Sequence, residues 1–179
     1  MAELPIGVKI LNLKTHHDDR GDFTEILRRE WLDDLELVQW NLSNSKANCL
    51  RGFHLHHTHW DYLICLRGSL HLALKDLRIN SPTYGLVYQH TFDDSKLQAI
   101  TIPPGVGHGF YFTEESLHIN AVTHYWDVDD ELACHWKDPN LGIEWGISDP
   151  IISKKDEEAT SLEVLLDTIS KYQDRLWPK

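Results

Sequence analysis

Four histidines and one carboxylate gather within a short stretch of the chain. Four of the 12 histidines lie within six residues of one another, and the group is His54, His56, His57 and His59, with Asp61 just after it. Residues i and i+2 of a β-strand point to the same face, so His54 and His56 are expected to share one. Two kinds of chemistry fit such a group. It can hold a divalent metal ion, or a neutral histidine oriented by a carboxylate can remove a proton beside a ketone.

A second segment carries a further histidine. The spacing His54-x-His56-x4-Asp61-x6-Gly68 resembles the first motif of the cupins, and Pro103-x-Gly105-x2-His108 resembles the second. The resemblance implies a small barrel in which His54, His56, Asp61 and His108 could hold Zn, Fe, Mn or Ni. The register can slide, because His57-x-His59 is another His-x-His pair. The alternative without function is a set of solvent-facing loop histidines and one core histidine.

The elements that would position these side chains are mostly short strands. Alternating apolar and polar residues predict strands over 8–13, 23–28, 37–43, 51–57, 62–66, 69–75, 85–89, 99–102, 109–112 and 118–125. Residues 16–22 have the composition of a polar turn, and residues 29–35 that of a short helical or irregular link. Many short strands at this spacing are typical of a sandwich or barrel. We therefore expect an all-β, cupin-type jelly-roll barrel whose polar strand residues line a cavity.

The end of the chain has a different pattern. Thr160-Ser161-x-Glu163 resembles a capping box, and Leu162, Leu165, Leu166 and Ile169 follow helical spacing. We expect one amphipathic C-terminal α-helix packed on the barrel. A chain of 179 residues is expected to form a single domain, 1–179, with the barrel over about 5–150 and the tail and helix over about 151–179.

Composition limits the partners. The formal net charge of −11 argues against nucleic acid or an anionic membrane, because both need a basic surface. A small anionic ligand still fits, since a few arginines in a pocket suffice. The odd number of cysteines without zinc-ribbon spacing predicts reduced thiols of a cytoplasmic protein. No stretch approaches the length of a membrane span, and no signal peptide opens the chain.

Seven landmarks, in this order, give the chain a resemblance to the RmlC family, the dTDP-4-dehydrorhamnose 3,5-epimerases. They are Asp19-Arg20-Gly21-x-Phe23-x-Glu25, Gln39-x-Asn41-x-Ser43-x-Ser45, Arg51-Gly52-Phe53-His54, Ser81-Pro82-Thr83-Tyr84-Gly85, Pro103-Pro104-Gly105-Val106-Gly107-His108, Trp136-x-Asp138-Pro139 and Ser153-x-Lys155-Asp156. The resemblance implies a jelly-roll homodimer with exchanged N-terminal strands. It implies a nucleotide-diphosphate 4-keto-6-deoxy sugar as ligand and an epimerisation that requires no cofactor.

The resemblance also assigns site residues. His54 would be the catalytic base and Asp156 its carboxylate partner, while Arg20 would contact the nucleotide phosphates. A guanidinium suits that role because its fork matches phosphate oxygens. Further residues that would bind the substrate are Glu25, Gln39, Asn41, Arg51, His108, Asn120 and Trp126.

Three positions depart from the family pattern. Asp61 stands where the family has an enolate-stabilising lysine, Asn120 stands where it has a general-acid tyrosine, and Trp126 replaces a further aromatic residue. Asn120 can hydrogen-bond an oxyanion but cannot donate a proton as an acid. The leading hypothesis is therefore a metal-free epimerase or isomerase with His54 as base, which acts either at C3 only or at both C3 and C5. The alternatives are a metal-dependent cupin enzyme that uses the four-residue metal set, and a non-catalytic sugar-nucleotide-binding relative.

Overall fold

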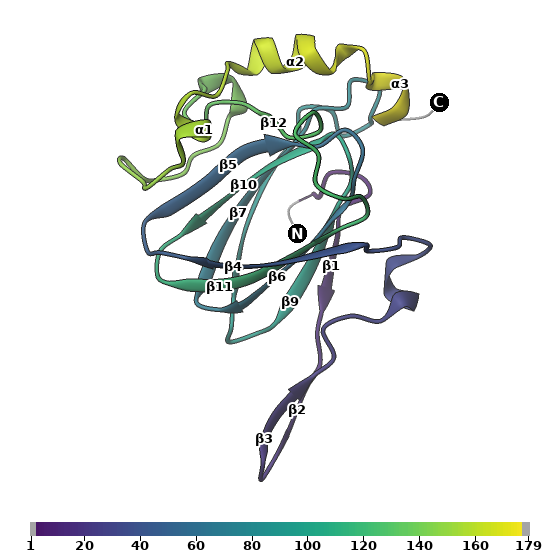
Figure 1. The fold of residues 1–179 in the computed structure, drawn as a ribbon, viewed down its shortest axis with the longest axis vertical. Helices are drawn as coiled ribbons and strands as arrows, with labels where there is room; N and C mark the ends of the chain where they lie inside the picture. The colour runs from purple at the N-terminus through teal and green to yellow at the C-terminus, as the bar shows by residue number, and fades with distance from the viewer. Residues whose placement is uncertain (1–2, 177–179) are drawn as a thin grey trace.

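Two antiparallel five-stranded sheets face each other in the computed structural model, which describes residues 3–176 (Figure 1). The first sheet has the order β1 (Lys9–Asn12), β9 (Gln98–Ile102), β6 (Asp61–Arg67), β11 (Ser116–Val122) and β4 (Gln39–Ser45). The second has the order β12 (Leu132–Ala133), β5 (Cys49–Leu55), β10 (Val106–Phe112), β7 (Ser69–Asp76) and β8 (Val87–Asp93). Strands distant in sequence lie side by side in both sheets, as in a jelly roll. The predicted all-β jelly-roll barrel is confirmed.

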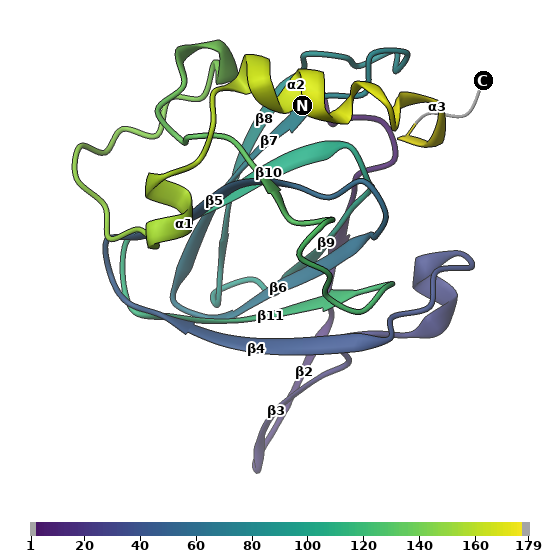
Figure 2. The same ribbon diagram turned by 45° about the horizontal axis from the view of Figure 1, so that its top comes forward.

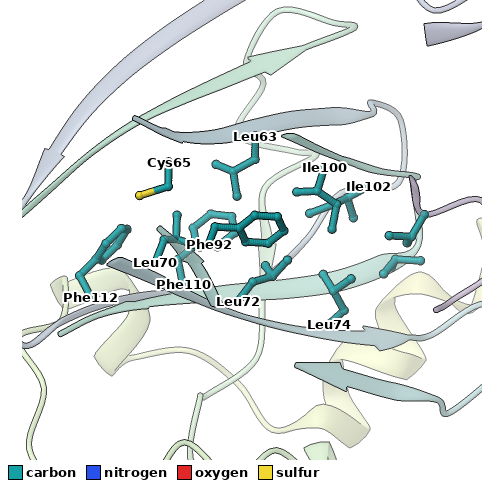
Figure 3. Packing of buried hydrophobic residues seen from close by; sticks show 12 residues of the cluster. Leu63, Cys65, Leu70, Leu72, Leu74, Phe92, Ile100, Ile102, Phe110 and Phe112 are labelled. Atoms are coloured by element: carbon teal, nitrogen blue, oxygen red, sulfur yellow. The ribbon is translucent and has the colours of Figure 1, made fainter. Parts of the chain in front are cut away.

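The hydrophobic core fills the space between the two sheets at one end of the barrel. Figure 3 shows side chains from both sheets pointing toward one another, among them Leu63 of β6, Leu72 of β7 and Ile100 of β9. Each of these three is at most 1% exposed. Alternation along each strand sends every second side chain inward, so the barrel interior takes one face of each sheet.

A β-bulge in β5 changes which of its side chains face inward. His108 of β10 lies opposite His54, but Phe110 lies opposite Arg51, so β5 has one extra residue between the two pairs. Arg51 and His54, three residues apart, therefore both line the same cavity. Gly52 in the bulge has φ +120°, and a Cβ atom there would lie 2.8 Å from the Cα atom of Gly109. A glycine is needed at this position on both counts.

The C-terminal segment covers the outer face of the second sheet (Figure 2). It contains α1 (Lys154–Glu157), α2 (Leu162–Ser170) and α3 (Gln173–Leu176), and two 3-10 helices lie earlier, at Arg29–Leu32 and Pro139–Leu141. The Ser161 hydroxyl accepts a hydrogen bond from the Val164 N–H at 3.3 Å, which caps α2. Leu165 and Ile169 pack on Phe53 of β5. The predicted amphipathic helix is confirmed, and residues 177–179 of the predicted tail lie outside the described residues.

The predictions for residues 16–28 were wrong in part. Residues 16–22, expected to be a turn, belong to a hairpin of β2 (Thr15–Asp18) and β3 (Gly21–Thr24), and the strand expected over 23–28 ends at Thr24. Figure 1 shows this hairpin extending away from the barrel. Its residues are mostly exposed on both faces, so the sequence lacks the alternation by which a strand is recognised.

Two further boundaries also differ from the sequence prediction. β10 begins at Val106, which places His108 within a strand, and β8 begins at Val87, after Gly85 in a turn with φ +79°.

Cys49, Cys65 and Cys134 are free thiols. Between residues 3 and 176, the structure contains no helix of the length and apolarity that a membrane span requires.

Candidate active site

A cavity of about 680 Å³ opens where β4, β5 and β11 approach the C-terminal segment. It continues inward into a recess of about 120 Å³, and both parts share His54, Asn120 and Glu131 in their linings. Arg51, Asp156 and Lys155 lie in the outer part only, whereas His56, Asp61 and His108 lie in the recess only. The cavity therefore has a wide mouth with cationic groups and a narrow floor of histidines and carboxylates.

His54 and Asp156 form a hydrogen-bonded pair at the junction of the two parts. The distance from His54 Nε2 to Asp156 Oδ1 is 2.6 Å, and their side chains are 18% and 4% exposed. Burial alone would raise the pKa of Asp156, but the hydrogen bond and charge of His54, with hydrogen bonds from Ser153 and Gly52, together hold the pKa below its usual value. An ionised Asp156 can only accept, so Nε2 carries the proton and Nδ1 is left as the basic nitrogen.

Asp156 reaches His54 from outside the barrel strands. It lies in α1, where its backbone N–H donates to the Ser153 hydroxyl at 3.1 Å. The Gly52 N–H donates to the second carboxylate oxygen at 3.4 Å. Two backbone groups thus fix the helix turn and the carboxylate relative to β5, which orients the imidazole ring.

Glu131 is a second carboxylate beside His54, and sequence reasoning missed it. Its Oε1 atom lies 3.5 Å from His54 Nδ1 and 3.3 Å from Lys155 Nζ. Burial alone would raise the pKa of Glu131, but His56, His54 and Lys155 lower it below its usual value. The residue lies in the connection between β11 and β12, which has no periodic pattern that could have indicated its position. An imidazolium at His54 would have a carboxylate on each side.

Four of the predicted substrate-binding residues surround the mouth. The Gln39 side-chain amide donates to Asn41 Oδ1 at 2.9 Å, and its oxygen accepts from the backbone N–H of Trp126 at 3.0 Å. The Trp126 indole N–H donates to Glu131 Oε2 at 2.9 Å, which leaves its ring 61% exposed at the opening. Arg51 donates to the Ser45 hydroxyl at 3.0 Å. Amide, indole and guanidinium groups are thus presented to any ligand that enters.

His118 of β11 also lines the outer cavity and was not among the predicted site residues. Its Nδ1 atom is buried and has no hydrogen-bond partner within residues 3–176. Burial, with a further contribution from Arg51, lowers the pKa of His118 to about 4. A neutral imidazole in this wall can donate or accept one hydrogen bond from a ligand.

The recess brings together most of the predicted metal-binding set, with one exchange. His56, His59 and Asp61 have potential ligand atoms that all lie within 4.8 Å of one another. His59 was outside the predicted set, whereas the predicted His54 is paired with Asp156 instead. The His108 ring lies 5.2 Å from the His56 ring, measured between centroids. Burial lowers the pKa of His56, and it lowers the pKa of His108 to about 4.

His57 and His59 do not form the alternative pair that their spacing suggested. The ring of His57 stacks on Tyr172, with centroids 3.8 Å apart, and so points toward the C-terminal segment. Residues 56–60 follow the end of β5 without regular strand structure, so alternation does not apply to them. This turn is why His56 and His59, three residues apart, reach the same recess.

Arg20 and Glu25 are not brought to the cavity by their own chain. Arg20 lies at the tip of the β2–β3 hairpin with a side chain 89% exposed, and it pairs with Asp18 at 2.6 Å. Glu25 follows β3 and pairs with Arg28 at 2.8 Å. Neither residue lines the outer cavity or the recess.

The arrangement is suited to proton transfer at carbon. A histidine with one proton held by a carboxylate can accept a second from a substrate, and the charge that forms is stabilised by the two flanking carboxylates. The cavity is wide enough for a ligand larger than a single sugar ring. Asn120 in the wall can donate a hydrogen bond to oxygen.

Comparisons with known proteins agree with this chemistry. Residues 3–164 match the family model described as dTDP-4-dehydrorhamnose 3,5-epimerase. The chain is 33% identical over 154 residues to a dTDP-4-dehydrorhamnose 3-epimerase of Streptomyces niveus, covering 84% of this chain and 72% of that protein. It is 32% identical over 171 residues to the 3,5-epimerase of Salmonella typhimurium, covering 90% and 93%. Among solved structures, ChmJ, a 3'-monoepimerase from Streptomyces bikiniensis in complex with dTDP-quinovose, has a TM-score of 0.85 at 26% identity and 98% coverage of both chains.

Proposed function

The chain belongs to the dTDP-4-dehydrorhamnose 3,5-epimerase family, and we propose that it epimerises a dTDP-linked 4-keto-6-deoxyhexose at C3, with His54 as the base. The observation that carries the proposal is the 2.6 Å hydrogen bond between His54 and Asp156 beside the cavity. His54 Nδ1 takes the proton from C3, next to the C4 ketone. The electron pair of the C–H bond forms a C3–C4 double bond, and the negative charge moves to the C4 oxygen. A different proton, supplied by water at the opposite face of C3, completes the epimerisation as the C4 ketone re-forms, and His54 Nδ1 then releases the first proton to solvent.

The mouth of the cavity is proposed to bind the nucleotide. Arg51 supports this role because its guanidinium can pair with diphosphate oxygens, and its one hydrogen bond to the described residues runs from Nε to Ser45. The exposed ring of Trp126 can stack on the base or the sugar. His108 would lie below the sugar, in the recess. The redox state of the sugar is unchanged by proton removal and return, so the reaction needs no redox cofactor.

Asn120 supports a reaction at C3 alone. It occupies the position at which the family has a general-acid tyrosine, and an amide has no acidic proton to deliver at C5. Its Nδ2 donates to Asp61 Oδ1 at 3.1 Å, and its buried Oδ1 has no partner among the described residues. That oxygen can accept a hydrogen bond from a sugar hydroxyl, which is a binding role and not an acid role.

A homodimer with exchanged N-terminal strands is proposed as the active form. Its support is the β2–β3 hairpin, which projects from the barrel with Arg20 and a 64% exposed Phe23 near its tip (Figure 1, Figure 2). β4 forms an edge of the first sheet and exposes Trp40 and Leu42 by 45% and 66%. Exchange would bring Arg20 of one subunit to the cavity mouth of the other.

Each subunit is proposed to act as one domain over residues 1–179. The three free thiols favour a cytoplasmic location.

The test is solvent-deuterium wash-in on dTDP-4-keto-6-deoxyglucose, followed by mass spectrometry and NMR. One deuterium should enter at C3 and none at C5, and His54→Asn should abolish the exchange. A matched control is His124→Ala, an exposed histidine outside the cavity. Binding of the sugar nucleotide without exchange at either carbon would refute the proposed activity. It would indicate a non-catalytic binding protein.

A further inference from the structure

The recess contains four side chains of the kind that bind transition metals. The candidate ligand atoms of His56, His59 and Asp61 lie within 4.8 Å of one another, and these residues are 7%, 4% and 2% exposed. The ring of His56 stacks on that of His59, with centroids 3.9 Å apart, and its centroid lies 5.2 Å from that of His108. Tetrahedral metal–nitrogen bonds of about 2.0–2.1 Å place ligand atoms about 3.4 Å apart. The ligand atoms of these three residues are thus up to about 1.4 Å farther apart than in a formed site, and His108 lies outside this group.

The three imidazoles are held by one nitrogen each, which leaves the other available. His59 Nδ1 lies 2.8 Å from Asp130 Oδ2, and His56 Nδ1 lies 3.3 Å from the Asp130 carbonyl oxygen. His108 Nδ1 lies 3.4 Å from the Val106 carbonyl oxygen. These oxygens can only accept, so each Nδ1 carries the proton and each Nε2 carries a lone pair. None of the three Nε2 atoms has a hydrogen-bond partner within residues 3–176. Metal-binding histidines are commonly oriented through the second ring nitrogen in this way.

The electrostatics of the recess also favour a cation. Asp61 and Glu131 lie in its wall, and Asp130 lies next to Glu131 and contacts His59. No lysine or arginine lines this recess in the described part of the chain. Within residues 3–176, the only hydrogen bond to the Asp61 carboxylate comes from the neutral amide of Asn120. His59 Nε2, at 3.8 Å from Asp61, is too distant for a further one. A buried carboxylate with so few partners is costly unless a positive charge compensates it.

We propose that the recess binds a divalent transition metal ion of the zinc type through His56, His59, Asp61 and His108. The donor set of three imidazoles and one carboxylate suits such an ion. His54 is left out of the proposed set because its Nδ1 faces Glu131 Oε1 at 3.5 Å, and so it stays available as a base beside the metal. The proposal replaces the predicted four-residue set by one in which His59 takes the place of His54.

The role of the ion rests on the proposed epimerase function. Asp61 occupies the position of the family's enolate-stabilising lysine, so this chain lacks that cation and has a metal ligand in its place. An ion in the recess would face the ketone oxygen while His54 faces the neighbouring carbon. It would stabilise the negative charge that develops on that oxygen, as the lysine would. Proton removal and metal binding are then compatible within one cavity, which the sequence alone did not indicate.

The test is metal binding by the full chain, purified without a histidine tag and stripped with a chelator. Titration with Zn²⁺ by calorimetry should give one site per chain, and Co²⁺ should give the visible absorption of a tetrahedral or five-coordinate site. Asp61→Asn and His59→Ala should each weaken binding by at least about 10–100-fold, and Asp130→Asn should weaken it by about 10–100-fold because the Asp130 carboxylate orients His59. His124→Ala should bind as the wild type does.

The outcomes separate this proposal from the epimerase proposal. Stoichiometric metal binding without any deuterium exchange would support the site and refute the activity. Exchange at full rate in a protein that binds less than about 0.1 ion per chain would refute the site and support the activity. Because a variant can fail to fold, circular dichroism must first show native structure for each one. The titration of the wild type decides the question by itself, since the absence of a saturable site in it overturns the proposal.

Discussion

The replacement Asp156→Asn isolates the contribution of one carboxylate to the proposed base. Asn is nearly isosteric with Asp, and its side-chain oxygen can still accept the hydrogen bond from His54 Nε2. The ring and its tautomer are therefore retained, while the negative charge is lost. The charge is thus removed with the Ser153 cap left in place, while the 3.4 Å contact of the Gly52 N–H with Oδ2 is lost, because an amide nitrogen cannot accept a hydrogen bond.

The magnitude follows from the distances around His54. A unit charge about 4 Å from the imidazolium contributes about 4 kcal/mol at an effective dielectric constant of about 20, which corresponds to roughly a thousandfold in rate. Glu131 Oε1, at 3.5 Å from Nδ1, remains and compensates for part of the loss. We therefore expect Asp156→Asn to lower kcat by about 10²–10³-fold. Glu131→Gln should cost less, because Lys155 at 3.3 Å already neutralises part of that charge.

The assay is the rate of deuterium wash-in at C3 under saturating substrate, with the dissociation constant of dTDP measured separately. Binding of dTDP should be unchanged, because the nucleotide is proposed to lie at the mouth near Arg51. A loss of less than about threefold in kcat would contradict the assignment of Asp156 as the partner of the base. A large loss with equally weakened dTDP binding would indicate that the carboxylate acts in ligand binding.

Two further predictions concern assembly and stability. If exchanged hairpins complete the sites, the Arg20→Ala and His54→Asn proteins should each be inactive alone. Their mixture after subunit exchange should recover roughly a quarter of wild-type activity. No recovery in verified heterodimers would place Arg20 outside the partner's site. Burial alone would raise the pKa of Asp76, but hydrogen bonds from Arg78, Thr83 and Ser81 hold it below its usual value. This stabilisation is present above the unfolded pKa of about 3.9 and is lost as the pH falls through the folded pKa. The free-energy difference between the wild type and Asp76→Asn in chemical denaturation should therefore shrink below about pH 4, and a constant difference would contradict this.

Regular periodicity made much of the barrel predictable. Apolar alternation marked the strands that enclose the core, and the spacing of Leu162, Leu165 and Ile169 marked α2 and its buried face. His54 and His56 were expected on one face, and both line the recess. These predictions rest on local geometry that repeats along the chain, so they require no knowledge of distant contacts.

The parts that were missed lie where the repeat is broken. The bulge at Gly52 is an irregularity in the pairing of β5 with β10, and the sequence of β5 alone does not indicate which of the two strands carries the extra residue. His59 lies in a turn and Glu131 in a long connection, so neither follows a strand period. The fold determines their positions through the contacts of Asp130 with the backbone N–H groups of His57 and Thr58, at 2.7 and 3.1 Å.

The origin of Asp156 in the C-terminal segment has a consequence for the order of events during synthesis. Ile151 pairs with Asn48 and Leu50 beside β5, and this pairing carries α1 and its carboxylate to His54. The ribosome makes the chain from its N-terminus, so the parts made first can begin to fold first. All ten strands of the two sheets are made before this segment, so a nascent barrel can close with its histidine still lacking an orienting partner. The proposed base becomes competent only when the last segment docks, which ties catalytic activity to a completed chain.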